Sequence, residues 1–184
     1  MTLNIIHLSK RIDRFELLEK EIRLQEISDY KIWDGVTDDM STVRGISQAH
    51  KQIVRYAKEF KLPYILIAED DIRFTSLGAF DFFIQNIPKD YDLYLGGIIY
   101  GKLEADNTVK DFSGTMLYLI HERFYDIFLS IPGNYHIDRG LNNKGKFVVC
   151  YPMAAIQYNG YSDSSKRNMK YDIYIKAKAL FRNV

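Results

Sequence analysis

The sequence predicts a mixed α/β fold with a mainly parallel central sheet flanked by helices. Segments typical of strands alternate with segments typical of helices along the chain, and this order favours a layered α/β arrangement. The apolar run at 63–68, which reads PYILIA, is typical of a central strand covered on both faces. A length of 184 residues, with 47% hydrophobic and 27% charged residues, is typical of a globular protein, so we expect one domain over 1–184.

The first half of the chain contains the clearest elements. Residues 3–8 read as a strand, and we expect Asp13 to cap the helix that follows, whose apolar face contains Phe15, Leu18 and Ile22. Residues 30–33 read as a second strand that ends in an Asp34-Gly35 turn. The next helix has apolar residues at spacings of three and four, which form one stripe: Ile46, Ala49, Ile53, Ala57 and Phe60.

The second half of the chain continues the alternation after the apolar run. We expect helices at 78–87 and 124–131, and strands at 91–95, 115–120 and 147–150. The Gly96-Gly97 pair predicts a break in the chain, and residues 101–111 are expected to form a mobile connection. The sequence contains no internal repeat and no low-complexity linker, which agrees with one layered α/β unit.

Charge and cysteine content limit the functional classes. A formal net charge of +1 gives no argument for a nucleic-acid footprint, so we expect no nucleic-acid partner. Cys150 is the only cysteine, which excludes an intramolecular disulfide and a thiolate metal cluster and indicates a reducing compartment. The first residues lack the charge order of a secretory signal, and no apolar run approaches membrane-spanning length. We therefore expect a cytoplasmic protein.

The C-terminal segment at 166–184 differs in charge from the rest of the chain. It contains six cations and one acid, a local balance of +5. The apolar residues of this segment would share one helical face, which predicts a basic amphipathic helix. Such a helix would either dock on the core with a solvated cationic face or make a peripheral contact with the inner face of a membrane.

Three consecutive carboxylates, Glu69, Asp70 and Asp71, follow the predicted central strand. Open α/β sheets bind ligands at the carboxyl ends of their strands. In an extended chain, Glu69 and Asp71 would point to one side and Asp70 to the other. Clustered carboxylates repel one another, whereas a hard divalent cation would keep them ionised. We therefore predict a Mn²⁺ or Mg²⁺ site with Glu69 and Asp71 as ligands; a solvated acidic turn is the alternative.

Several separated segments resemble the family 25 glycosyltransferases, which include lipooligosaccharide and collagen hydroxylysine galactosyltransferases. The opening strand and turn at 5–14 read IIHLSKRIDR, and the acidic motif at 67–74 reads IAEDDIRF. The helix segment GISQAH at 45–50 is similar to the family pattern, although Ala49 replaces the usual serine. Later blocks follow in the family's order: 114–118 (GTMLY), 136–138 (HID), Pro152, Gln157 and 162–163 (SD).

This resemblance implies a GT-A-like, Rossmann-like fold and a nucleotide-diphosphate sugar donor, with UDP-galactose as the usual one. It also implies a Mn²⁺ or Mg²⁺ cofactor, inversion at the anomeric carbon, and a glycan or glycolipid acceptor such as lipooligosaccharide. A metal held by Asp71 and Glu69 would stabilise the charge of the diphosphate leaving group. An acceptor hydroxyl would lose its proton to a base on the opposite face of the sugar.

Asp138 and Asp163 are the two candidate bases. We favour Asp138 because an extended segment at 136–138 would place the His136 imidazole and the Asp138 carboxylate on one side. His136 is also a candidate metal ligand, or else a surface histidine after the Pro132-Gly133 turn. Asp163 has the alternative role of capping a loop.

The remaining candidates belong to the donor side. Arg11 and Arg14 follow the first strand and could contact the phosphates or the base of a nucleotide, or else remain solvated. Asp34 could contact the nucleoside or simply form its turn, and Asp70 could hold the acidic loop or the ribose. His50 borders the apolar helix stripe, so it is either a hydrogen-bonded core histidine or a brace for the acidic loop.

Two other functional classes share these features. A nucleotidyltransferase would use the same carboxylates to hold Mg²⁺, but the sequence lacks a glycine-rich phosphate loop near its start. A non-catalytic partner of another transferase would keep the fold and bind only a nucleotide sugar. The ordered family-like segments favour the glycosyltransferase.

Overall fold

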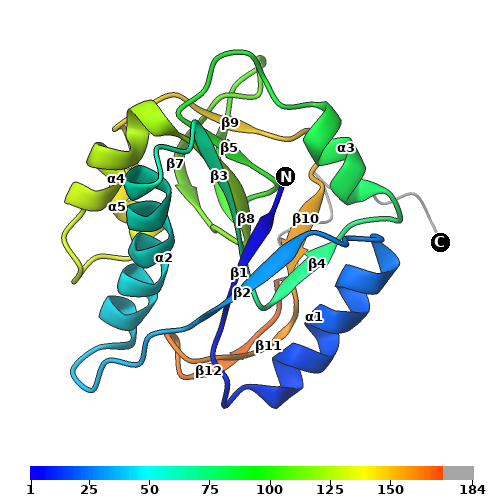
Figure 1. The fold of residues 1–184 in the computed structure, drawn as a ribbon, viewed down its shortest axis with the longest axis vertical. Helices are drawn as coiled ribbons and strands as arrows, with labels where there is room; N and C mark the ends of the chain where they lie inside the picture. The colour runs from blue at the N-terminus through cyan, green and yellow to red at the C-terminus, as the bar shows by residue number, and fades with distance from the viewer. Residues whose placement is uncertain (172–184) are drawn as a thin grey trace.

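The computed structural model describes residues 1–171, and its central element is a six-stranded sheet with the strand order β2-β1-β3-β8-β5-β9 (Figure 1). The strands are β1 (Leu3–His7), β2 (Tyr30–Asp34), β3 (Tyr64–Glu69), β5 (Leu93–Leu95), β8 (Leu117–His121) and β9 (Phe147–Val149). Only β8 runs antiparallel to its sheet neighbours, β3 and β5. The prediction of a mainly parallel sheet is confirmed, with one reversed strand near its centre.

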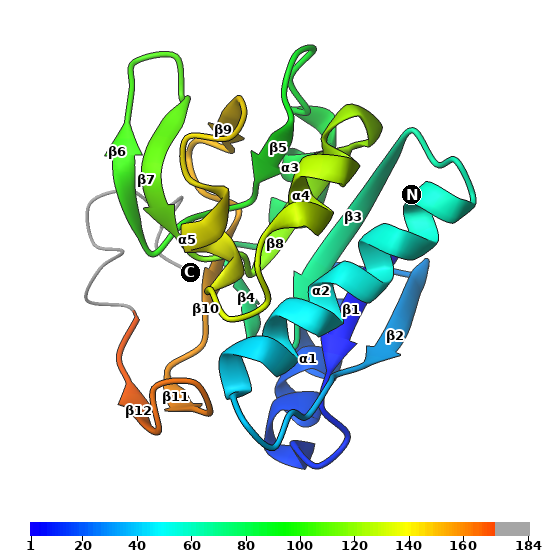
Figure 2. The same cartoon turned by 90° about the vertical axis from the view of Figure 1, so that its left-hand side faces the viewer.

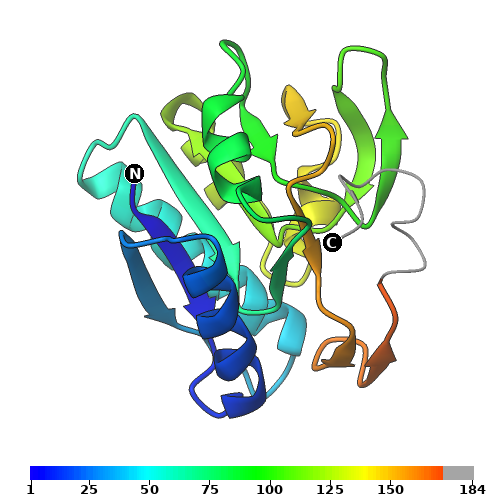
Figure 3. The ribbon, with the colours of Figure 1, turned by 90° about the vertical axis from the view of Figure 1, so that its right-hand side faces the viewer.

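Helices cover both faces of this sheet. On one face lie α2 (Thr42–Glu59), α5 (Ile137–Leu141), and α4 (Tyr125–Ser130), which continues a 3-10 turn, η1 (Glu122–Phe124) (Figure 2). The opposite face carries α1 (Ile12–Leu24) and α3 (Ala79–Gln85) (Figure 3). Within the described part of the chain, no helix has both the length and the apolar character needed to cross a membrane.

The alternation of side chains along β3 explains why this strand lies inside the sheet. Ile65 and Ile67 pack with residues of α2 and α4 in one apolar cluster. Leu66 and Ala68 pack in a second cluster, which also contains residues of α1 and α3. Because successive side chains of a strand point to opposite faces, an uninterrupted apolar run suits a strand covered on both sides. The run at 63–68 therefore forms the central strand that the sequence predicts.

Three small two-stranded sheets flank the central one. They pair β4 (Ile72–Phe74) with β10 (Ala155–Gln157), β6 (Tyr100–Leu103) with β7 (Val109–Ser113), and β11 (Gly160–Ser162) with β12 (Arg167–Met169). The prediction of a mobile connection at 101–111 is wrong, because this segment forms the β6–β7 hairpin. Val109 and Phe112 are buried in the core beneath it, a tertiary contact that outweighs the polar composition of the segment.

Three local predictions need correction. Asp13 does not cap α1: Arg11 occupies the N-cap position without a side-chain cap bond, and Asp13 accepts hydrogen bonds from Arg11 instead. The segment at 136–138 is not extended, because His136 is the N-cap residue of α5. Part of the basic segment lies in β12 rather than in a helix; the remainder of the predicted amphipathic helix, at 172–184, lies outside the described residues.

Candidate functional site

A cleft of about 380 Å³ opens at the carboxyl ends of β1 and β3. Its lining includes side chains from α2, the β3–β4 turn, the β7–β8 connection, α5 and the segment at 162–165. Most of the predicted site residues are among the residues that line it: Arg14, His50, Glu69, Asp70, Asp71, His136, Asp138 and Asp163. The fold thus brings together residues from the beginning, middle and end of the described chain.

Arg14 supplies a cation to the acidic triplet from within the protein. Strand β3 ends at Glu69, and Asp70 and Asp71 form the turn into β4, so the triplet is not extended as predicted. Arg14 Nη1 lies 2.8 Å from Asp70 Oδ1 and 3.0 Å from Asp71 Oδ2. The two turn residues therefore share one guanidinium, and Glu69 lies apart from them with other partners.

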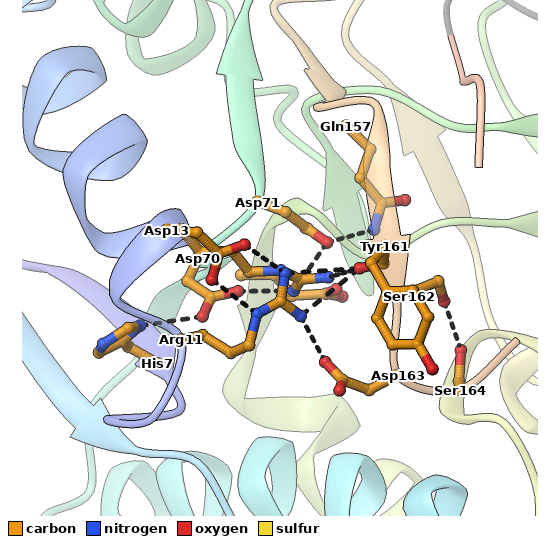
Figure 4. A network of polar contacts seen from close by, with 12 residues as sticks. His7, Arg11, Asp13, Asp70, Asp71, Gln157, Tyr161, Ser162, Asp163 and Ser164 are labelled. Carbon is orange, nitrogen blue, oxygen red and sulfur yellow. Dashed lines mark hydrogen bonds and ion pairs between the residues drawn. The ribbon is translucent and has the colours of Figure 1, made fainter. Parts of the chain in front are cut away.

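Asp70 is held on both carboxylate oxygens. His7 Nδ1 lies 2.9 Å from Oδ2 (Figure 4). Arg14 Nη1 donates to Oδ1 at 2.8 Å. The residue is only 5% exposed. With both oxygens engaged by residues that follow or end β1, Asp70 ties the acidic turn to the first strand. This placement fits the loop-holding role better than a contact with a ribose.

Asp71 has one carboxylate oxygen with a partner and one without, among the residues that the structure describes. Its Oδ2 accepts a hydrogen bond of 2.7 Å from Gln157 Nε2 (Figure 4). The same oxygen forms the ion pair with Arg14. Its Oδ1 is buried and has no hydrogen-bond partner among the described residues. Burial raises the pKa of Asp71 to about 7, against the influence of Arg14, and the nearby charges of Glu69 and Asp70 act in the same direction as burial.

Glu69 belongs to a separate hydrogen-bonded group. Thr115 Oγ1 donates to its Oε1 at 2.7 Å, and His50 Nε2 lies 3.5 Å from the same oxygen. His50 is 1% exposed, and its Nδ1 lies 2.8 Å from the hydroxyl of Tyr118. Burial opposes ionisation of Glu69, but His50 and Thr115 outweigh it and lower the pKa of this carboxyl. His50 is therefore a hydrogen-bonded core histidine that also contacts the first carboxylate of the acidic triplet.

The donor set of the acidic turn fits a hard divalent cation. Among residues 1–171, no three His, Cys, Asp or Glu side chains converge in an arrangement that could hold a metal by themselves, with or without His136. Mg²⁺, however, is commonly held by one or two carboxylates together with substrate phosphates. Asp71 and Glu69 both line the cleft. The Oδ1 of Asp71 is buried and has no hydrogen-bond partner among the described residues. They could supply the protein's share of such a coordination shell.

Asp138 lines the cleft from α5. Its Oδ2 accepts hydrogen bonds from Ser113 Oγ at 2.7 Å and from the Gly114 backbone N–H at 3.0 Å. Its Oδ1 accepts from the Arg139 backbone N–H at 2.7 Å. Within residues 1–171, Asp138 is held by these hydrogen bonds and takes part in no ion pair. A carboxylate has up to four lone-pair sites, so further hydrogen bonds from a ligand hydroxyl are chemically possible.

Asp163 is engaged differently from Asp138. Arg11 Nη1 lies 2.6 Å from Asp163 Oδ2, and the same guanidinium binds Asp13 (Figure 4). A proton on Asp163 would weaken its ion pair with Arg11, which makes this carboxylate the less suitable base. Arg11 itself does not line the main cleft but a small hollow beside it.

Asp34, like Arg11, is a predicted site residue that does not line the main cleft. It is exposed at the end of β2, and its backbone carbonyl accepts a hydrogen bond from Gln52 Nε2 at 2.7 Å. The next two residues, Gly35 and Val36, do line the cleft. Asp34 thus matches the turn-forming alternative more closely than a side-chain contact with a nucleoside.

Five residues of the site had no functional role in the sequence predictions. Four of them lie in family-like segments, which is a signal that could have identified them: His7, Thr115, Tyr118 and Gln157. Ser113 carries no such signal, because it precedes the segment at 114–118. A short polar residue acquires its role only through its partner, in this case Asp138.

The chain is similar to known proteins in its fold, although the sequence identities are low. No protein-family model matches the sequence, and neither does any curated protein sequence. Among solved structures, a glycosyltransferase involved in glycosylation of the major capsid of PBCV-1 matches with a TM-score of 0.53 and 13% identity. The match covers 95% of this chain and 98% of that one.

Two further solved structures are more distant. HddC from Yersinia pseudotuberculosis matches with a TM-score of 0.46 and 13% identity, over 80% of this chain and 67% of that one. A mutant Drosophila β-1,4-galactosyltransferase 7, in complex with manganese, UDP-Gal and xylobiose, matches with a TM-score of 0.43 and 10% identity. That match covers 73% of this chain and 54% of the other. The resemblance to family 25 stays a prediction, whereas the GT-A-like α/β fold is confirmed.

Proposed function

We propose that this protein is a metal-dependent inverting glycosyltransferase. It would move a hexose, with galactose as the expected sugar, from a UDP-sugar to a hydroxyl of a surface glycan such as lipooligosaccharide. The observation that carries the proposal is the buried Oδ1 of Asp71, which has no partner in the described chain and lies at the sheet edge where a GT-A-like fold would bind its donor.

On the donor side, Asp71 and Glu69 would hold Mn²⁺ or Mg²⁺. The bound ion would act as a Lewis acid that stabilises negative charge on the diphosphate leaving group. Arg14 adds a positive charge beside the acidic turn, and its own position is fixed by Asp70, Asp71 and the Tyr161 carbonyl. Gln157 orients Asp71 by its hydrogen bond to Oδ2, and His50 and Thr115 orient Glu69.

On the acceptor side, Asp138 would take the proton from the attacking hydroxyl. Inversion requires a single displacement, so the base must lie across the sugar from the diphosphate. Asp138 and the acidic turn belong to different elements and line the same cleft. The hydrogen bonds from Ser113 and Gly114 hold the Asp138 carboxylate in place, which would limit the reorganisation needed when the hydroxyl approaches.

The test is release of UDP from a panel of UDP-sugars, measured with Mn²⁺, with Mg²⁺ and with a chelator. We expect release from one donor, dependent on the metal and abolished by the chelator. Asp71→Asn should lose this metal-dependent activity because it removes the charged ligand oxygen. Asp81→Asn is the matched control, since Asp81 is an exposed acid on α3 outside the cleft.

A binding measurement separates the metal assignment from catalysis. Thermal unfolding of the wild type should shift to higher temperature when Mn²⁺ and UDP are added together, because ligands that bind only the native state stabilise it. The shift should be retained in Asp81→Asn and lost in Asp71→Asn. A full shift in Asp71→Asn would overturn the metal assignment. Absence of donor turnover with either metal would overturn the enzymatic proposal itself.

A further inference from the structure

Tyr100 forms part of the cleft wall beside Asp138. It belongs to β6, is 48% exposed, and lines the cleft. Exposed tyrosines are common on protein surfaces, but this one combines an open aromatic surface with a position inside a concave site. Aromatic side chains with a few convergent polar groups are the usual composition of a small-molecule site. The surroundings of Tyr100 therefore bear on what the cleft binds.

The register of the β6–β7 hairpin places Tyr100 directly opposite Ser113. Residues directly opposite each other in an antiparallel pair project their side chains on the same face. The hydroxyl of Ser113 donates to Asp138 at 2.7 Å. The aromatic ring of Tyr100 is thereby brought next to the carboxylate that would act as the base.

A β-bulge sets this register. Tyr100 pairs with Ser113 and Lys102 pairs with Lys110, so β7 has one more residue than β6 between these two pairs. Asp111, within the bulge, has a φ of +49°, an unfavourable value for a residue with a side chain. Bulges occur often beside active sites, where they redirect a side chain. Without the extra residue, Tyr100 would lose its pairing with Ser113.

Arg139, which lies on α5, contacts the Tyr100 ring. Its guanidinium carbon lies 5.4 Å from the centroid of the Tyr100 ring. The guanidinium is itself fixed by Asp111 Oδ1 at 2.7 Å and by the Phe112 carbonyl at 3.1 Å. One contact of the ring is therefore with a held cation, which restricts its motion, while nearly half of the tyrosine surface remains open.

We infer that Tyr100 and Asp138 together form a subsite for a pyranose ring of the acceptor. A pyranose has a face of C–H groups, which suits the negative face of an aromatic ring, and an edge of hydroxyls, which suits a carboxylate acceptor. This inference rests on the proposed function, since it assigns the acceptor to the Asp138 side of the cleft and the donor to the Glu69–Asp71 side. Tyr100 is a binding residue, and Asp138 receives the proton.

The experiment uses a panel of methyl hexopyranosides as probes and saturation-transfer NMR on the protein with UDP and Mn²⁺. We expect at least one glycoside to receive saturation from the wild type and from Tyr100→Phe, which keeps the ring. Tyr100→Ala should weaken its binding about tenfold, the size of a lost aromatic contact. Tyr30→Ala is the matched control, because Tyr30 is 44% exposed at the start of β2 and outside the cleft lining.

The outcomes separate this inference from the proposed function. Equal binding of the glycoside by Tyr100→Ala and wild type would overturn the subsite, as would no glycoside binding to the wild type. UDP release from the donor, measured without acceptor on the same samples, should be unchanged by the control variant Tyr30→Ala, since Tyr30 lies outside the cleft lining. If the wild type uses a donor but Tyr100→Ala leaves acceptor binding intact, the subsite fails and the glycosyltransferase proposal stands. If glycoside binding depends on Tyr100 but the wild type uses no donor, the glycosyltransferase proposal fails and the pyranose subsite stands.

Discussion

Arg14 Nη1 lies 3.0 Å from Asp71 Oδ2, and this ion pair joins the first helix to the acidic turn that follows the central strand. The same nitrogen contacts Asp70 Oδ1 at 2.8 Å. Both carboxylates are buried, so their charges depend on this guanidinium for compensation. The ion pair uses Asp71 Oδ2, and Oδ1 has no partner in the described chain. One carboxylate thus serves two purposes: Oδ2 stabilises the turn, and Oδ1 is the oxygen proposed to bind the metal.

Removal of Arg14 should destabilise the protein more than removal of Asp71. Arg14→Met is expected to lower the free energy of unfolding by about 2–4 kcal/mol, since it leaves two buried carboxylates without their cation. Asp71→Asn should partly restore stability in the Arg14→Met background, with a coupling energy of about 1–3 kcal/mol. Urea denaturation of the four proteins in the presence of a chelator measures both values. Additive effects would mean that the two side chains do not interact.

Asp138→Asn should slow transfer strongly while leaving the donor site intact. Loss of a general base is expected to lower kcat by roughly 10²–10⁴-fold, with the donor KM unchanged. Ser113→Ala should have a smaller effect, because the carboxylate keeps its bonds from Gly114 and Arg139. Steady-state kinetics with the accepted donor provides the measurement. Strong loss in Asp163→Asn together with near-normal activity in Asp138→Asn would transfer the role of base to Asp163.

Buried tyrosines should make the protein sensitive to alkali. Burial raises the pKa of Tyr91 to about 12, and it also raises the pKa values of Tyr94, Tyr118 and Tyr125. Above pH 10 the unfolded chain loses tyrosine protons that the native protein retains. The free energy of unfolding should therefore fall as pH rises from about 10 to 12.

Absorbance of tyrosinate and circular dichroism, recorded together during a pH titration, test this expectation. The buried tyrosines should ionise only as the secondary structure is lost, so the two signals should change over the same pH range. Tyrosine ionisation that is complete before any loss of structure would contradict the prediction.

Gly97 should tolerate no side chain. A Cβ atom at this position would lie 2.0 Å from the carbonyl oxygen of Ala155, the first residue of β10. The backbone N–H of Ala155 donates to the Gly96 carbonyl, which holds the two segments close together. Gly97→Ala is therefore expected to lower stability by about 3 kcal/mol, since backbone must move to relieve the overlap. Gly133→Ala is the control, because a Cβ there meets no atom within 4 Å. Equal midpoints of urea unfolding for the two variants would contradict the packing argument.

Much of the fold was predictable because its signals are local. The apolar run at 63–68 and the stripe of α2 each reflect which side chains are buried, and burial follows the period of a strand or a helix. The hairpin at 100–113 was missed because its composition is that of a loop and its burial depends on distant residues. The start of α5 was missed for a related reason, since a five-residue helix carries too short a pattern to define a period.

The amino-acid sequence alone shows three consecutive acids at the end of a buried central strand, and it predicts that a charged ligand binds at that edge of the sheet. The partners of each acid become visible in the folded structure: Arg14 contacts Asp70 and Asp71, and Thr115 donates to Glu69. Arg14 is 56 positions from Asp70, and Gln157 is 86 positions from Asp71. The donors and acceptors of a side chain define which kinds of group it can bind. Which partner lies within reach depends on how the strands and helices pack, because these residues are far apart in the sequence.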